Sequence, residues 1–209
     1  MDYQEYLRYR NDILEWIGGR LKKSRYQHTL GVEQTAVTLA RKFGADPNLA
    51  SLAALLHDNA KNLDLEQQLA ICKKSFSKKY NLTMDYANIL HAFAGAVEAR
   101  NRYSLLPEEV FSSICYHTTG RPEMTLMDKI IYCADFIEPG RPSFEGLAEA
   151  RKLVYDDLDK GLLYIMTHTF RFVAGKGKKV HPLTMEALDY YQVIKIPLKK
   201  EKQIKDSNS

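Results

Sequence analysis

The sequence has few cysteines, no long apolar run and little net charge, and each of these absences excludes a class of protein. Its three cysteines form no CxxC pair and cannot all be joined in disulfides, so we expect a reducing, cytoplasmic setting rather than a disulfide scaffold. The longest apolar stretches, residues 49–56 and 162–166, are far too short to cross a bilayer, and the start of the chain lacks a signal-peptide pattern. We therefore expect no membrane partner.

The charge and the composition are those of an ordinary globular protein. A net charge of +4 is too small to indicate a nucleic-acid partner, and most lysines and arginines are expected to be solvated. Apolar residues make up 45% of the chain and charged residues 27%, as in soluble domains. A chain of 209 residues suits one domain, because a second would have little core of its own. The oligomeric state stays open, with a homodimer as one alternative.

The apolar spacing is helical nearly throughout, which predicts an all-α fold, a single helical bundle with a metal centre in its core. Asp46 and Pro47 open a helix that is expected to run through Ala60, as an N-cap followed by proline does. The other helices are expected over residues 2–17, 22–43, 65–74, 87–103, 107–117, 125–137, 147–157, 158–174 and from 184. We expect an N-terminal helix (1–20) packing on the core, one main domain (21–196) and a flexible basic tail (197–209).

Four histidines and two aspartates are placed on the inward faces of five of these helices: His28, His57 with Asp58, His91, His117 and Asp135. A lone inward histidine is more often a hydrogen-bonded core residue than a ligand. A carboxylate that faces a core costs several kcal/mol unless it is paired. Six such groups on five helices are explained if they converge on metal, as in carboxylate-bridged helical bundles.

The number of candidate ligands indicates two ions rather than one. A catalytic zinc site typically uses three protein ligands and a water, and a carboxylate can bridge two ions. We expect Asp58 to be shared, with one ion completed by His28, His57 and Asp135 and the other by His91 and His117. Two ions roughly 3.5–4 Å apart would hold a hydroxide between them. Imidazole and carboxylate suit iron, manganese, cobalt or zinc, so the ligands alone do not name the metal.

A centre of this kind predicts hydrolysis of a phosphate ester or anhydride. Asp58 and Lys61 are the candidate catalytic residues, with Lys61 one turn beyond His57 on the same expected helix and able to neutralise a phosphate oxygen. Arg141, just after a helix stop, could reach the cleft and bind phosphate through its bidentate fork. The glycine- and lysine-rich segment 175–182 could close over a polyphosphate. For these groups a solvated surface role is the alternative.

From about residue 25 to residue 190 the chain resembles the YqeK family of HD hydrolases, which are bacterial symmetrical diadenosine tetraphosphatases. The His57-Asp58 pair alone would be weak support, and the segments around His117 and Asp135 are far more specific. The matching segments, in order, are His28-Thr29-Leu30-Gly31-Val32, Leu55-Leu56-His57-Asp58 with Lys61, His91-Ala92, Tyr116-His117-Thr118-Thr119-Gly120, Ala134-Asp135-Phe136-Ile137-Glu138-Pro139-Gly140-Arg141 and His181-Pro182-Leu183-Thr184.

The resemblance implies a symmetrical bis(5'-nucleosyl)-tetraphosphatase with a di-iron centre, which cuts diadenosine tetraphosphate, a dinucleoside polyphosphate, into two ADP through a metal-bridging hydroxide. It implies nucleotide contacts at His28, Asp58, Asn59, Ala60, Lys61, His91, His117, Thr118, Asp135, Arg141, Gly177, Lys178, Lys179, Val180, His181 and Pro182. Two alternatives remain: an HD phosphohydrolase acting on mononucleotides or guanosine tetraphosphate, and a non-catalytic nucleotide-binding metalloprotein. His91 and His117 favour the two-metal enzyme.

Overall fold

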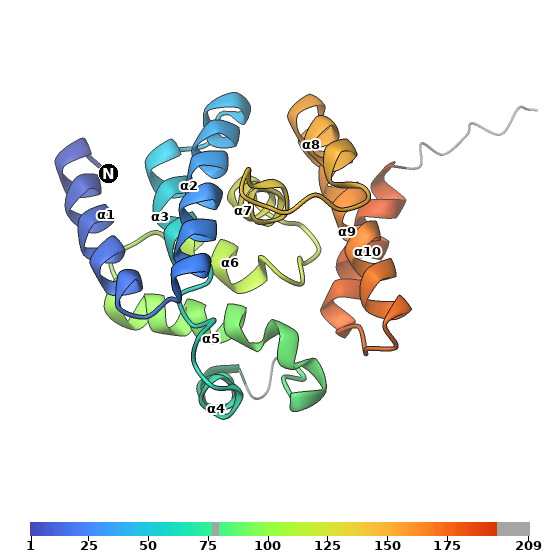
Figure 1. The fold of residues 1–209 in the computed structure, drawn as a ribbon, viewed down its shortest axis with the longest axis horizontal. Helices are drawn as coiled ribbons and strands as arrows, with labels where there is room; N and C mark the ends of the chain where they lie inside the picture. Colours follow the sequence, from blue (N-terminus) through green and yellow to red (C-terminus); the bar gives the residue numbers. More distant parts are fainter. Residues whose placement is uncertain (77–79, 196–209) are drawn as a thin grey trace, which may run out of the picture.

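The structure, a computed structural model, describes residues 1–76 and 80–195, which form ten α-helices, one 3₁₀ turn and no β-strand (Figure 1). The all-α prediction is therefore confirmed, while the expected tail at 197–209 lies outside the described residues. The elements are α1 (Tyr3–Gly18), α2 (Lys23–Phe43), α3 (Pro47–Leu56), α4 (Leu65–Phe76), η1 (Met84–Tyr86), α5 (Ala87–Arg102), α6 (Glu108–Tyr116), α7 (Leu126–Ile137), α8 (Leu147–Asp156), α9 (Leu158–Gly175) and α10 (Pro182–Lys195).

Side-chain caps explain why several helices begin where the sequence predicts. The carboxylates of Asp2 and Asp46 accept hydrogen bonds from backbone N–H groups in the first turns of α1 and α3. Thr125 and Asp128 form a reciprocal capping box at the start of α7. Gly44 ends α2 with a φ of +82°, a left-handed conformation that costs glycine little. Local chemistry therefore sets these boundaries.

Helix α3 ends earlier than the sequence predicts. It stops at Leu56, whereas the apolar pattern carried the helix through Ala60. Nδ1 of His57 lies 2.6 Å from the carbonyl oxygen of Ala54, and Nδ2 of Asn59 donates to the carbonyl oxygen of Leu56 at 2.7 Å. These side chains bind carbonyls that a continuing helix would use for its own backbone bonds. The chain instead continues in short turns, and these turns carry the His-Asp pair.

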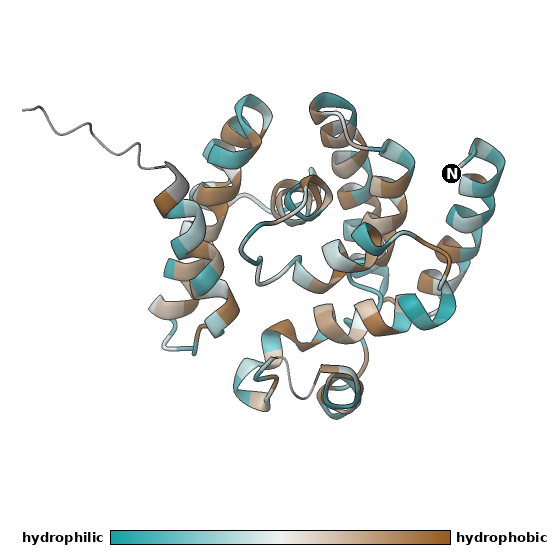
Figure 2. Cartoon of the chain, turned by 180° about the vertical axis from the view of Figure 1, so that it is seen from behind, coloured by the Kyte–Doolittle hydropathy of each residue, from teal (hydrophilic) through white to brown (hydrophobic). Residues whose placement is uncertain are grey.

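Helix α7 lies at the centre of the fold, with α1, α2 and α3 on one side and α8, α9 and α10 on the other (Figure 1). It packs against α2, α6 and α9, and both Ile130 and Ile131 are fully buried. Apolar residues lie mainly on the helix faces that meet, and hydrophilic residues on the outer faces (Figure 2). This arrangement lets helices distant in the sequence deliver side chains to one interior point.

The first helix belongs to the same core as the rest. Ile13 and Ile17 are fully buried in the main hydrophobic cluster, and α1 packs against α3.

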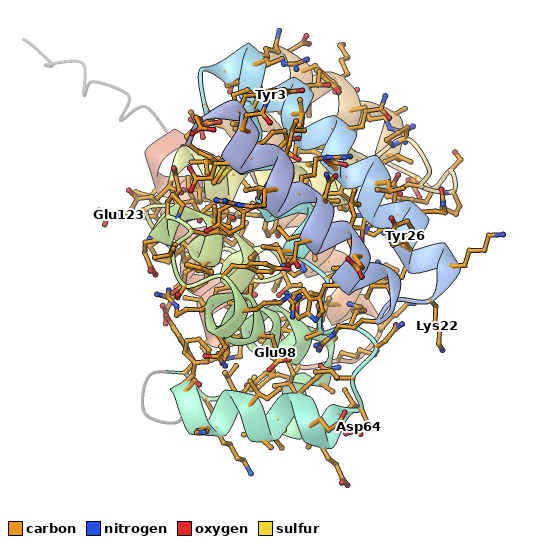
Figure 3. The ribbon with its side chains drawn as sticks, turned by 90° about the vertical axis from the view of Figure 1, so that its left-hand side faces the viewer. Tyr3, Lys22, Tyr26, Asp64, Glu98 and Glu123 are labelled. Carbon is orange, nitrogen blue, oxygen red and sulfur yellow. The ribbon has the colours of Figure 1, made fainter. Side chains whose placement is uncertain are left out.

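The connections between helices carry exposed charged residues, such as Lys22 before α2 and Asp64 before α4 (Figure 3). Among residues 1–76 and 80–195, no helix combines the length and apolarity that a membrane span requires.

Candidate metal centre

The six predicted ligands come together at one interior point, although five separate segments supply them. His28 lies on α2, His91 on α5 and Asp135 on α7, while His117 follows the last residue of α6. The His57-Asp58 pair lies in the turns after α3. Ligand atoms from three overlapping sets lie within 4.8 Å of one another: His28, His57 and Asp58; His57, His117 and Asp135; Asp58, His91 and His117.

Asp58 lies between two groups of histidines. Its Oδ2 is 3.4 Å from Nε2 of His57 and 4.0 Å from Nε2 of His28. Its Oδ1 is 3.2 Å from Nε2 of His91 and 3.7 Å from Nε2 of His117. A carboxylate whose two oxygens face different donor groups has the geometry of a bridging ligand.

Asp135 lies beside the first of these groups. Its Oδ1 lies 2.9 Å from Nε2 of His28 and 3.8 Å from Nε2 of His57. His28 and His57 therefore lie on the Oδ2 side of Asp58 with Asp135 beside them, and Asp135 also has a ligand atom within 4.8 Å of one on His117, so the division between two ions stays a prediction.

The hydrogen bonds of the rings test whether a metal fits. Nδ1 of His57 lies 2.6 Å from the carbonyl oxygen of Ala54, and Nδ1 of His117 lies 2.7 Å from that of Ile114. Because a carbonyl only accepts, each Nδ1 must carry a proton, and in the neutral ring Nε2 then has the lone pair that can bind a metal. The buried Nε2 of His57 and Oδ1 of Asp58 have no hydrogen-bond partner among the described residues. Buried polar atoms without a hydrogen-bond partner are rare, and a bound metal would provide the missing interaction.

The surroundings of Asp58 and His91 favour their metal-binding protonation states. Burial by itself raises the pKa of Asp58, but the imidazoles of His57, His117 and His91 outweigh it and hold the pKa well below its usual range. Burial lowers the pKa of His91 to about 4, so its ring is neutral at neutral pH. An ionised carboxylate beside a neutral imidazole is a donor pair that divalent metals bind.

Glu138 is a site residue that our sequence reasoning missed. It is buried and accepts from Nδ1 of His28 at 3.0 Å and from the backbone N–H of Gly140 at 2.6 Å. A Cβ at Gly31 would overlap its carboxylate, so the absence of a side chain there permits the approach of α2. Glu138 belongs to the segment 134–141, which also contains Asp135. A carboxylate three residues beyond a predicted ligand was the signal that the sequence offered.

Arg25 was missed as well. Its Nη1 donates to Oδ2 of Asp58 at 2.9 Å, and it lies three residues before His28, on the same side of α2. A guanidinium at this position adds positive charge next to the cluster.

A cleft of about 780 Å³ opens over the cluster. Lys61 borders it from the turns after α3, not from a continued helix, and its Nζ lies 3.0 Å from Nε2 of His91. Nη2 of Arg141 donates to Oδ1 of Asp135 at 2.7 Å, which places this arginine in the cleft as well. The predicted site residues that line the cleft are Asp58, Lys61, His91, His117, Thr118, Asp135 and Arg141, and Arg25 joins them.

Other predicted contact residues lie outside this lining. The side chain of Asn59 is buried and donates to the carbonyl oxygen of Gly95 at 2.9 Å, and Ala60 is fully buried. In the segment 177–182, residues 179–181 line a small cavity of about 30 Å³ that shares Thr118 with the cleft. Gly177, Lys178 and Pro182 line neither space.

Comparison with known proteins adds independent information. The family model described as HD domain matches residues 25–140. The chain is 36% identical over 176 residues to the symmetrical bis(5'-nucleosyl)-tetraphosphatase of Halalkalibacterium halodurans, covering 84% of this chain and 93% of the relative. It is 38% identical over 175 residues to the protein of the same name from Bacillus subtilis, with the same coverage. A crystal structure from Clostridium acetobutylicum, described as a predicted HD superfamily hydrolase involved in NAD metabolism, superposes with a TM-score of 0.80 at 39% identity, covering 88% of this chain and 97% of that one.

Proposed function

The chain belongs to the HD-domain family and, within it, to the symmetrical bis(5'-nucleosyl)-tetraphosphatases, and on that premise we propose that it hydrolyses diadenosine tetraphosphate into two ADP. The observation that carries the proposal is the His–Asp cluster at the base of a cleft bordered by three cationic side chains. A substrate with a run of phosphates between two nucleosides matches that combination of charge and volume.

We propose that the cluster holds two metal ions that share Asp58, with His28, His57 and Asp135 on one side and His91 and His117 on the other. The two oxygens of Asp58, which face different histidines, support this division. Iron is our proposed metal, and the same donors accommodate manganese, cobalt or zinc. When bound, such ions supply Lewis acidity and an activated water for displacement at phosphorus.

The chain's own cations would bind and orient the phosphates. Lys61 and Arg25 lie beside Asp58 and His91, where a phosphate at the cluster would place its negative oxygens. The guanidinium of Arg141 is held by the backbone oxygen and by Oδ1 of Asp135, each 2.7 Å from Nη2. An arginine positioned in this way loses little side-chain entropy when it binds phosphate. These residues therefore supply positioning and charge neutralisation for in-line attack.

The test is the product profile of purified, metal-loaded protein with diadenosine tetraphosphate. We expect ADP as the sole nucleotide product, loss of activity with chelator and recovery when metal is restored. AMP and ATP together would refute the symmetrical assignment. Mononucleotides, guanosine tetraphosphate and NAD belong in the same assay, because preferential turnover of one of them would replace the proposed substrate. Binding without turnover of any of them would identify a nucleotide-binding protein instead.

Isotope labelling tests the position of attack separately. In-line displacement places the nucleophile, the phosphorus and the leaving oxygen on one axis, so attack at an inner phosphorus releases the other half as ADP. A single turnover in ¹⁸O-water should therefore label one ADP of each pair, on its terminal phosphate. Label on an AMP phosphate would move the attack one phosphate nearer to an adenosine.

A further inference from the structure

One side of the cleft is aromatic, and the metal cluster does not account for it. Phe136 lies near the end of α7, Phe144 in the segment between α7 and α8, and His168 on α9. Their ring centroids lie 5.4 Å apart for Phe136 and Phe144, 5.5 Å for Phe136 and His168, and 5.7 Å for Phe144 and His168. Phe172, also on α9, lines the same cleft. We call these four residues the aromatic platform.

Part of the platform is exposed to solvent, unlike aromatic rings that pack inside a hydrophobic core. Phe172 is 56% exposed and Phe144 is 38% exposed. His168 and Phe172 are four residues apart and so share one face of α9. Nε2 of His168 must donate to the carbonyl oxygen of Glu145, 3.0 Å away, which holds the ring in place. Rigid aromatic rings left open within a cleft are typical of a binding surface for a flat apolar group.

The other residues of the cleft indicate which ligand carries the flat apolar group. Arg25, Lys61 and Arg141 line the same space, and they suit a polyanion. A volume of about 780 Å³ lies in the upper part of the range of small-molecule sites. A ligand that presents both a flat apolar ring system and several phosphates is a nucleotide, and base–aromatic stacking is largely independent of sequence because every base has a π-face.

We propose that the aromatic platform stacks the second nucleobase of a dinucleoside polyphosphate. The inference rests on the proposed function, because that substrate carries two bases, of which the segment 177–182 is expected to contact one. On α9, His168 and Phe172 belong to the platform, whereas Thr169 and Val173 line both the cleft and the small cavity next to residues 179–181, so the two spaces adjoin at this helix. One half of the substrate would then bind at the platform and the other where the two spaces adjoin.

The decisive experiment compares a ligand with bases against one without. The ligands are a diadenosine tetraphosphate analogue, with a methylene group in place of the central bridging oxygen, and inorganic tetraphosphate, both measured by calorimetry on metal-loaded protein. Phe172→Ala and Phe144→Ala should each raise the Kd of the analogue roughly tenfold, the loss expected for one base–aromatic stack. The Kd of inorganic tetraphosphate should stay unchanged. Phe172→Trp should restore binding, whereas Phe172→Leu should not.

The matched control is Leu105→Ala, which removes an apolar side chain that is 85% exposed and lies outside the cleft lining. It should leave both Kd values unchanged. An unchanged Kd for the analogue in the phenylalanine variants, or an equal loss for inorganic tetraphosphate, would overturn the platform. If the wild-type protein still converts diadenosine tetraphosphate into ADP, the proposed function survives that result. If the wild-type protein binds the analogue through Phe172 but releases no ADP, the platform stands and the proposed function falls.

Discussion

Nδ1 of His28 lies 3.0 Å from Oε1 of Glu138, so a buried carboxylate from the end of α7 orients an imidazole on α2. Because the carboxylate accepts, Nδ1 must donate, and Nε2 of His28 is left to face Asp58 and Asp135. Carboxylate–histidine pairs of this kind fix the tautomer and the direction of metal ligands.

Replacing Glu138 with alanine should therefore lower metal affinity by about 10- to 100-fold, as the loss of an outer partner of a ligand typically does. Glu138→Gln should lose less, because its amide oxygen can still accept from His28. Metal retained after dialysis against a weak chelator, measured by elemental analysis, checks the effect. Glu149→Ala, on the exposed face of α8, is the control. Equal retention in all variants would show that Glu138 does not position the ligand.

Protein purified without chelators should contain about two ions per chain, with iron prominent, because the two oxygens of Asp58 face different histidines and can each bind an ion. Elemental analysis together with quantitative amino-acid analysis measures this ratio. Fully active protein with a stable content of one ion per chain would contradict the two-metal proposal.

Asp58→Asn should abolish hydrolysis more completely than Lys61→Ala, because the carboxylate would hold both ions whereas the lysine only tunes the charge on the substrate. Steady-state rates at saturating metal compare the two variants. The metal-free Asp58→Asn protein should be less stable to urea at neutral pH than the metal-free wild type, because the lowered pKa of Asp58 means that its ionised form, paired with Arg25, stabilises the fold. If the Asp58→Asn protein keeps most of its turnover, Asp58 is not an essential ligand of the metal centre.

Replacing Lys178 and Lys179 with alanine should raise KM more than it lowers kcat, as the loss of uniform substrate binding does. In the structure Nζ of Lys179 lies 2.7 Å from Oδ2 of Asp85, an exposed pair that contributes little to stability. The control Asp85→Asn frees Lys179 from this pair and should leave KM the same or lower. Unchanged KM and kcat in the double variant would show that Lys178 and Lys179 are solvated surface residues that do not bind the substrate.

Cys72 should resist thiol reagents in the native protein at pH 8. Burial raises the pKa of its thiol to about 12, so the reactive thiolate is absent at that pH. The unfolded chain deprotonates at a lower pH than the folded one, so this group makes the protein less stable as the pH rises above about 9. Labelling with Ellman's reagent, with and without urea, tests this, and Cys72→Ala identifies the thiol. Complete labelling of native Cys72 within the mixing time would contradict its burial.

Helix boundaries could be predicted where local chemistry decides them. Asp2, Asp46 and Thr125 cap helices by bonding backbone groups within three residues, and Gly44 ends one through its own φ. The end of α3 could not be predicted from the same signals, because the apolar pattern runs on through Ala60. There, hydrogen bonds from His57 and Asn59 to helix carbonyls override the periodicity.

The all-α class and the six residues that meet at the centre could be predicted from the sequence, because apolar spacing and ionisable side chains are local features. Tertiary packing makes the two oxygens of Asp58 face different histidines and brings Glu138 to His28. It also brings rings from α7, from the segment before α8 and from α9 together in one exposed platform. These relations join segments far apart in the chain, and packing around α7, rather than local propensity, sets the distances between them.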